Sequence, residues 1–93
     1  MTPEEKRKLA QEELREENPD ALFLDGLDDA LIGIGQQAGQ DPLAIYSEQA
    51  IVKILTNSWG MSSEEAYEYY YFNIAGAWFG PETPFIVTEF PSL

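Results

Sequence analysis

The stretch ALIGIGQQAGQDPLAIYS, residues 30–47, decides the fold that the sequence predicts. Residues 30–35 alternate between two sets of small or apolar side chains, which is typical of a strand backed by close packing. The turn residues Gly-Gln-Asp-Pro at 39–42 lead into a second apolar segment at 42–46, which we expect to pair with the first as a hairpin. Glycines at 33 and 35 weaken a strand, so they indicate a bulge or the near approach of another element.

Two helices are expected after this hairpin. Ser47 is a natural N-cap for a helix over about residues 48–58, which Gly60 ends. Its apolar side chains recur at three-to-four spacing: Ile51, Ile54, Leu55 and Trp59. Ser62 and Glu65 form a capping box for a second helix, which runs to residue 75 or 76.

A loop at 80–84 and a final strand at 85–90, closed by Pro91, complete a β-β-α-α-β order. We therefore predict an α+β fold with a small, mainly antiparallel sheet of about three strands and two helices on one face. The segment ALFL at 21–24 adds a short strand or a docking segment. We place this single α+β domain at residues 19–93.

A charged helix precedes the domain. Thr2 caps it in a capping box with Glu5, and Pro3 suits the first helical position. Its apolar content is thin: Leu9, Ala10 and Leu14. We predict a solvated N-terminal helix or tail over residues 1–18, which frays in solution or docks on a second chain.

Charge is the strongest compositional signal, with a net value of −12 over 93 residues. Four of the five basic residues lie in the first seventeen positions, so the remaining chain has only Lys53 against eleven acids. Such a body repels nucleic-acid backbone and anionic membrane, and we expect no direct nucleic-acid partner and no membrane partner. The charge either serves solubility alone or meets a basic surface on another protein. With no secretory signal and no long apolar run, the sequence predicts a cytoplasmic protein.

The residue types argue against catalysis. The chain has no Cys and no His, which excludes disulfides and thiolate metal sites and removes the commonest general base. Asp28 with Glu65 or Glu68 is the carboxylate pair that acid–base chemistry would use. The serines 58, 62 and 63 have no base to activate them. A domain of this size also has little room for a cleft of ~300 Å³ or more, so we predict no enzymatic activity and no cofactor.

Two short motifs have simpler explanations than a ligand site. The glycines of GIGQQAG, residues 33–39, do not have the spacing of a phosphate loop, and hairpin geometry explains them better. The acids of DGLDD, Asp25, Asp28 and Asp29, are weak candidates for a metal site because their spacing differs from that of a calcium loop. A turn in which Asp caps backbone amides is the better explanation, and we predict no metal.

The run YEYYYFNIAGAWF, residues 67–79, concentrates the aromatic side chains. On a helix with about 100° per residue, Tyr67, Tyr70, Ile74 and Trp78 share a stripe that would fill the core. Further aromatics exceed what that face needs, and aromatics of this kind are enriched at protein interfaces. The predicted protein-binding residues are Tyr69, Tyr71, Phe72, Trp78 and Phe79. The alternatives are core plus a homo-oligomer interface, or an aromatic cage for a cation.

Three quoted segments carry a resemblance: LDGLDDALIGIGQQAG at 24–39, AIYS at 44–47 and GMSSEEAYEYYYFNIAGAWFGPETPFIV at 60–87. Their pattern resembles a family of small proteins of tailed bacteriophages, cyanophages among them, over about residues 21–88. No activity or site residue comes with this resemblance. It implies a phage protein that binds a host protein and alters its work, a class that includes enzyme inhibitors and DNA mimics.

We therefore expect a non-enzymatic, phage-encoded acidic protein that docks on a host protein and modulates it, with host metabolic enzymes among the candidate partners. The alternative is a DNA-mimic inhibitor of a host nucleic-acid-binding or defence protein. A homodimer is a further association that the sequence leaves open.

Overall fold

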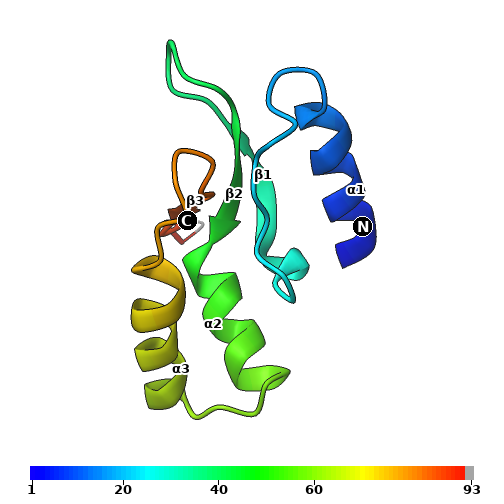
Figure 1. The fold of residues 1–93 in the computed structure, drawn as a ribbon. Helices are drawn as coiled ribbons and strands as arrows, with labels where there is room; N and C mark the ends of the chain where they lie inside the picture. The colour runs from blue at the N-terminus through cyan, green and yellow to red at the C-terminus, as the bar shows by residue number, and fades with distance from the viewer. Residues whose placement is uncertain (92–93) are drawn as a thin grey trace.

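The computed structural model describes residues 1–91, so the last two residues of the predicted domain lie outside the description. The fold is α+β, with three α-helices and a three-stranded sheet (Figure 1). The elements are α1 (Pro3–Leu14), the 3₁₀-helix η1 (Asp28–Ala30), β1 (Leu31–Gly35), β2 (Leu43–Ser47), α2 (Glu48–Asn57), α3 (Ser63–Tyr70), the π-helix η2 (Tyr71–Ala75) and β3 (Phe85–Val87). Within the described residues, no helix is long and apolar enough to cross a membrane.

The sheet is mixed, with β2 between β1 and β3. The predicted hairpin is present, and β1 and β2 are antiparallel with Ile34 opposite Ala44. The strand β3 is parallel to β2, with Ile86 opposite Tyr46, so half of the pairing differs from the mainly antiparallel expectation. The reason is the return path: α2 leads away from the end of β2, α3 returns, and the loop over 76–84 reverses the chain before β3 begins (Figure 1).

The strand β3 has three residues, whereas the sequence predicted six. Beyond it, the side-chain amide of Gln49 on α2 binds the backbone of Glu89. Its Nε2 donates to the Glu89 carbonyl at 2.7 Å, and its Oε1 accepts from the Glu89 N–H at 3.0 Å. After Val87 the backbone therefore no longer pairs with β2, and the Gln49 side chain of α2 binds it instead.

The glycines of β1 have the role that the sequence predicted. The pairing with β2 shifts register between Leu31 and Gly33, which is a bulge or irregularity. A Cβ atom on Gly35 would collide with the side chain of Ile45 on β2. Bulge and close approach are both present, at different glycines.

The core lies where β2 passes into α2. Ser47 ends the strand and caps the helix, because its Oγ accepts from the Ala50 N–H at 3.2 Å. Ile51 and Leu55 of α2 are fully buried, as is Tyr46 of β2. The hydroxyl of Tyr46 accepts from the Leu24 N–H at 2.9 Å, so residues 21–24 form a docking segment and not a strand.

The helix α1 is packed against β1 and η1, whereas the sequence predicted a solvated helix or tail. Ala10 and Leu14 are buried, so even the thin apolar stripe contributes. Polar contacts also hold α1 in place: the Arg7 guanidinium pairs with Asp28 at 3.0 Å and lies 4.4 Å from the centroid of the Phe23 ring. We attribute the docking to these charges, which a hydrophobic pattern does not reveal.

Candidate functional site

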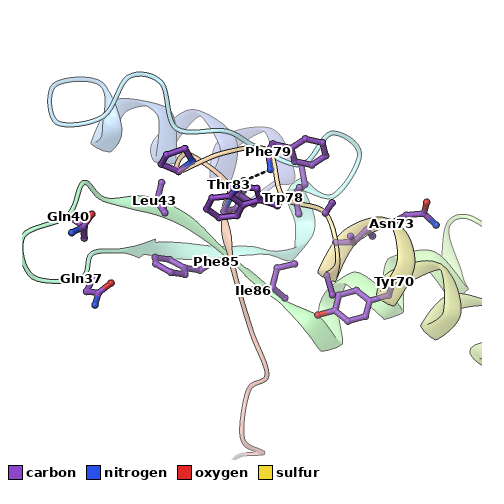
Figure 2. A pocket seen from close by; sticks show the side chains of 16 residues that line it. Gln37, Gln40, Leu43, Tyr70, Asn73, Trp78, Phe79, Thr83, Phe85 and Ile86 are labelled. Atoms are coloured by element: carbon purple, nitrogen blue, oxygen red, sulfur yellow. Dashed lines mark hydrogen bonds between the residues drawn. The ribbon is translucent and has the colours of Figure 1, made fainter.

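A cleft of about 550 Å³ lies between the 76–84 loop, the hairpin loop and β3 (Figure 2). We call it the aromatic cleft. In Figure 2, Gln37 and Gln40 stand at its hairpin end and Tyr70 at its helix end, with Trp78 between them. Its lining includes Gln37, Gln40, Leu43, Tyr70, Asn73, Trp78, Phe79, Thr83, Phe85 and Ile86.

The aromatic cleft is free of charge in a strongly acidic protein. Among residues 1–91, none of the 16 residues that line it is an acid or a base. The polar groups in the lining are neutral, namely the amides of Gln37, Gln40 and Asn73 and the hydroxyls of Thr83 and Tyr70. Such a surface offers apolar contact area and hydrogen bonds without the desolvation penalty of an ion.

A hydrogen-bonded turn holds the aromatic residues of the loop in place. The Phe79 N–H donates to the Thr83 hydroxyl oxygen at 2.8 Å, and this hydroxyl donates to the Gly80 carbonyl at 2.8 Å. The Thr83 N–H also donates to the Gly80 carbonyl at 3.1 Å. The loop therefore has a defined shape while the Trp78 side chain stays 73% exposed and that of Phe79 64% exposed.

Tyr70 forms the helix end of the cleft. Its side chain is buried, and burial together with the neighbouring Glu48 carboxylate raises the pKa of its phenol to about 12. The phenol therefore stays protonated at neutral pH, where it can form hydrogen bonds but cannot act as a base.

The five predicted binding residues lie in different places. Trp78 and Phe79 line the aromatic cleft. Tyr71 is exposed beside α3, where its ring stacks on that of Tyr67 with centroids 6.4 Å apart. Phe72 is 79% exposed, above a shallow hollow of about 300 Å³ that Tyr69 also lines.

The predicted core stripe is wrong at two of its four positions. Tyr70 is buried and Ile74 packs against the core, but Tyr67 and Trp78 are exposed. Trp78 lies beyond the end of η2 at Ala75, so a helical wheel does not apply to it. At the start of α3, the small side chain of Ala66 takes the buried position one turn before Tyr70.

Tyr69 also differs from its predicted role as surplus. It is half-buried, and its ring meets that of Trp59 edge-on with centroids 5.8 Å apart. Its contribution is to the packing between α3 and the end of α2.

Sequence reasoning missed the half of the cleft that lies outside the aromatic run. Gln37 and Gln40 belong to the hairpin loop and Phe85 to β3. They line the same cleft as Trp78 because β3 pairs in parallel with β2, which places Phe85 opposite Ile45. No local pattern in the sequence encodes that register.

The other candidate motifs have structural roles. Asp25 and Asp28 pair with Arg7, at 3.6 and 3.0 Å, and Asp29 pairs with Lys6 at 3.4 Å. No group of three acidic side chains within residues 1–91 is arranged to hold a metal ion. The Glu65 carboxylate accepts from the Ser62 N–H, and its pKa is lowered by that backbone hydrogen bond and by one with the Ser62 side chain.

This arrangement bears on two expectations from the sequence. The DNA-mimic alternative stays a hypothesis that needs rows of free carboxylates, and five of the seventeen acids, Glu5, Asp25, Asp28, Asp29 and Glu65, form hydrogen bonds or ion pairs within the chain. The expectation that a small domain has little room for a cleft is wrong, because two clefts exceed 500 Å³. The aromatic cleft, however, carries no carboxylate pair for acid–base chemistry.

Comparison of the chain with family models, with curated proteins and with solved structures gives no match. The geometry of the cleft therefore carries the functional argument.

Proposed function

We propose that this protein is a non-enzymatic binding protein that captures a partner protein in the aromatic cleft. The observation that carries the proposal is the absence of charge from the cleft lining within residues 1–91 of a chain whose net charge is −12. A surface that served solubility alone would place its acids here as elsewhere. Exposed apolar patches surrounded by polar groups are typical of protein interaction sites.

The aromatic side chains in the cleft suit an interface hot spot. Trp78 is 73% exposed and Phe85 is 41% exposed, so each has a large apolar area that a partner can cover. Trp and other aromatics supply most of the binding free energy at many interfaces, and neutral polar groups at the rim add directional hydrogen bonds. Gln37 and Gln40 stand at that rim in Figure 2.

The charge outside the cleft favours a basic partner. Beyond residue 17, Lys53 is the single base among eleven acids. A partner with an apolar side chain for the cleft and basic residues around it would gain on-rate and orientation from this field. We propose a host protein as this partner, following the resemblance to phage proteins, and modulation of its activity as the result.

A comparison of two variants in a pull-down from bacterial host lysate tests the proposal. Trp78→Ala removes an aromatic side chain from the cleft, and Phe90→Ala removes one that is 94% exposed outside it. We expect the wild type and Phe90→Ala to retain a stoichiometric partner, and Trp78→Ala to lose at least about tenfold of it, as at a hot spot.

Two results would contradict the proposal. The first is the absence of any stoichiometric partner with the wild-type protein. The second is equal retention by the two variants, which would place the binding surface outside the cleft.

A further inference from the structure

A second cleft, of about 620 Å³, lies along α1 and β1. We call it the α1–β1 cleft. In Figure 1, α1 lies on the opposite side of β1 from β2, away from β3 and the 76–84 loop. Three of the large apolar side chains in its lining are well exposed: Met1 at 77%, Leu9 at 47% and Ile32 at 49%.

The strand beside this cleft is flanked by α1, but its residues Ile32 and Gly33 remain exposed. β1 is an outer strand that pairs only with β2. Its sequence LIGIG contains no charge and no proline, the residues that commonly prevent an edge from associating. The Leu31 N–H donates to the Asp28 carbonyl of η1, and within residues 1–91 no other hydrogen bond from outside the sheet reaches the backbone of residues 31–35. By contrast, β3 is only three residues long, and Gln49 binds the chain beyond it.

The helix side of the cleft is self-complementary. Lys6, Leu9, Ala10 and Glu13 line it, and their spacing places them on one face of α1. If two such helices pack antiparallel about a two-fold axis, Lys6 of one faces Glu13 of the other. The exposed Leu9 side chains then lie near the axis, since Ala10 is buried within its own chain. A two-fold interface requires this reciprocity of every contact.

Charge restricts which face two copies of this protein can share. Two copies with a net charge of −12 each repel one another, so they need an approach that brings cations to the interface. Four of the five basic residues lie within the first seventeen positions, on or beside α1. Lys6 is part of this supply, and it already pairs with Asp29 at 3.4 Å.

We propose that a second copy of this chain docks on the α1–β1 cleft, to give a two-fold dimer with reciprocal Lys6–Glu13 pairs. The dimer leaves the aromatic cleft of each copy open, so it goes beyond the partner capture proposed above. It makes the protein bivalent toward that partner, and bivalency raises the apparent affinity for a partner that is itself an oligomer.

Sedimentation velocity over a range of concentrations tests the dimer. We expect the mass to rise from 10.5 kDa toward twice that value with increasing concentration. Ile32→Lys should raise the dissociation constant by at least about tenfold, because it places an ammonium group in an apolar interface. Phe90→Lys adds the same charge at an exposed aromatic residue outside the cleft, and it should leave the dimer intact.

Exchanging the charges of Lys6 and Glu13 tests whether these residues pair across the interface or only stabilise the fold of α1. Lys6→Glu and Glu13→Lys should each weaken the dimer, because each sets like charges opposite one another, and the double variant should restore it. Far-UV circular dichroism of each variant confirms that α1 is folded. A wild-type protein that stays monomeric at every concentration overturns the proposal. So does a dimer that Ile32→Lys leaves unchanged, or a double variant that remains as weak as the single ones.

Partner retention in the pull-down separates this proposal from the proposed function. Ile32→Lys should lose the dimer but still retain the partner in the aromatic cleft, whereas Trp78→Ala should lose the partner but keep the dimer. If Ile32→Lys lost the partner as well, at a bait density where bivalency contributes nothing, the two clefts would not act independently and the proposal would fail.

Discussion

The helix α2 and the segment from α3 to the 76–84 loop are both rich in apolar side chains in the sequence, but they differ in how many of these side chains the structure buries. Ile51, Val52 and Leu55 of α2 are buried in the core. In the aromatic segment, Ala66 and Tyr70 are the buried residues of α3, while Trp78 and Phe79 are exposed. The spacing of apolar residues therefore locates a core only where one face of a helix is apolar. Where most of the circumference is apolar, packing leaves a surplus, and that surplus is available to a partner.

Truncation of α2 should have the largest effect on stability. Leu55→Ala removes a fully buried side chain, and we expect it to lower the free energy of unfolding by about 2–5 kcal/mol. Chemical denaturation followed by circular dichroism measures the change. A loss below about 1 kcal/mol would mean that α2 is not the centre of the core, and the contrast between the two regions would collapse.

Tyr70 is the buried aromatic side chain of α3, and its titration tests that burial. Because its pKa is raised from 10 to about 12 in the folded state, its stabilising effect is complete below pH 10 and is lost as the pH rises toward 12. The shift corresponds to about 2–3 kcal/mol. Tyr70→Phe should make the decline in stability over this range shallower, which urea titrations at pH 9–12 measure.

Burial also raises the pKa of Tyr46, so part of the alkaline decline should persist in Tyr70→Phe. An identical pH profile in the wild type and Tyr70→Phe would contradict the burial of Tyr70.

The start of α3 rests on a capping box. The Ser62 hydroxyl accepts from the Glu65 N–H at 3.2 Å, and the Glu65 carboxylate accepts from the Ser62 N–H at 3.0 Å. Ser62→Ala should lower the free energy of unfolding by about 1 kcal/mol. Ser63→Ala, the adjacent position within the helix, is the matched control and should change it by less than about 0.5 kcal/mol. Equal effects would show that the cap does not position the aromatic segment.

The smallest effect on stability is expected at the exposed aromatics. Phe72→Ala removes a large apolar side chain that is 79% exposed, and we expect a change within about 0.5 kcal/mol. Thermal unfolding of Phe72→Ala and Leu55→Ala under the same conditions compares the two losses of stability directly. A loss that approaches that of Leu55→Ala would place Phe72 in the core.

Much of the fold could be predicted from the sequence because its signals are local. Ser47 and Ser62 are caps that act within three residues, and Gly35 is small because Ile45 lies against it. The parallel pairing of β3 could not be predicted, since it depends on the path of a nine-residue loop. The docking of α1 was missed because the Arg7–Asp28 pair spans 21 positions and leaves no periodic pattern.

For the candidate site, the sequence predicted five aromatic binding residues and left open whether they lie in the core or at an interface. Trp78 and Phe79 were named from the sequence, and they do line the cleft. Tyr69 was named as well, and it packs against Trp59 instead. The glutamines of the hairpin loop could not be predicted from the sequence, because only the pairing of β2 with β3 places that loop and Trp78 around the same cleft.

The fluorescence of Trp78 during partner binding tests most directly whether the aromatic cleft is the binding surface. Trp59→Phe leaves Trp78 as the only tryptophan, and its exposed indole should be readily quenched by acrylamide in the free protein. When the captured partner is added to saturation, the account predicts a blue shift of the emission and a severalfold loss of quenching, because the indole becomes buried. If the partner binds, as calorimetry would show, while the quenching of Trp78 stays unchanged, the aromatic cleft is not the binding surface.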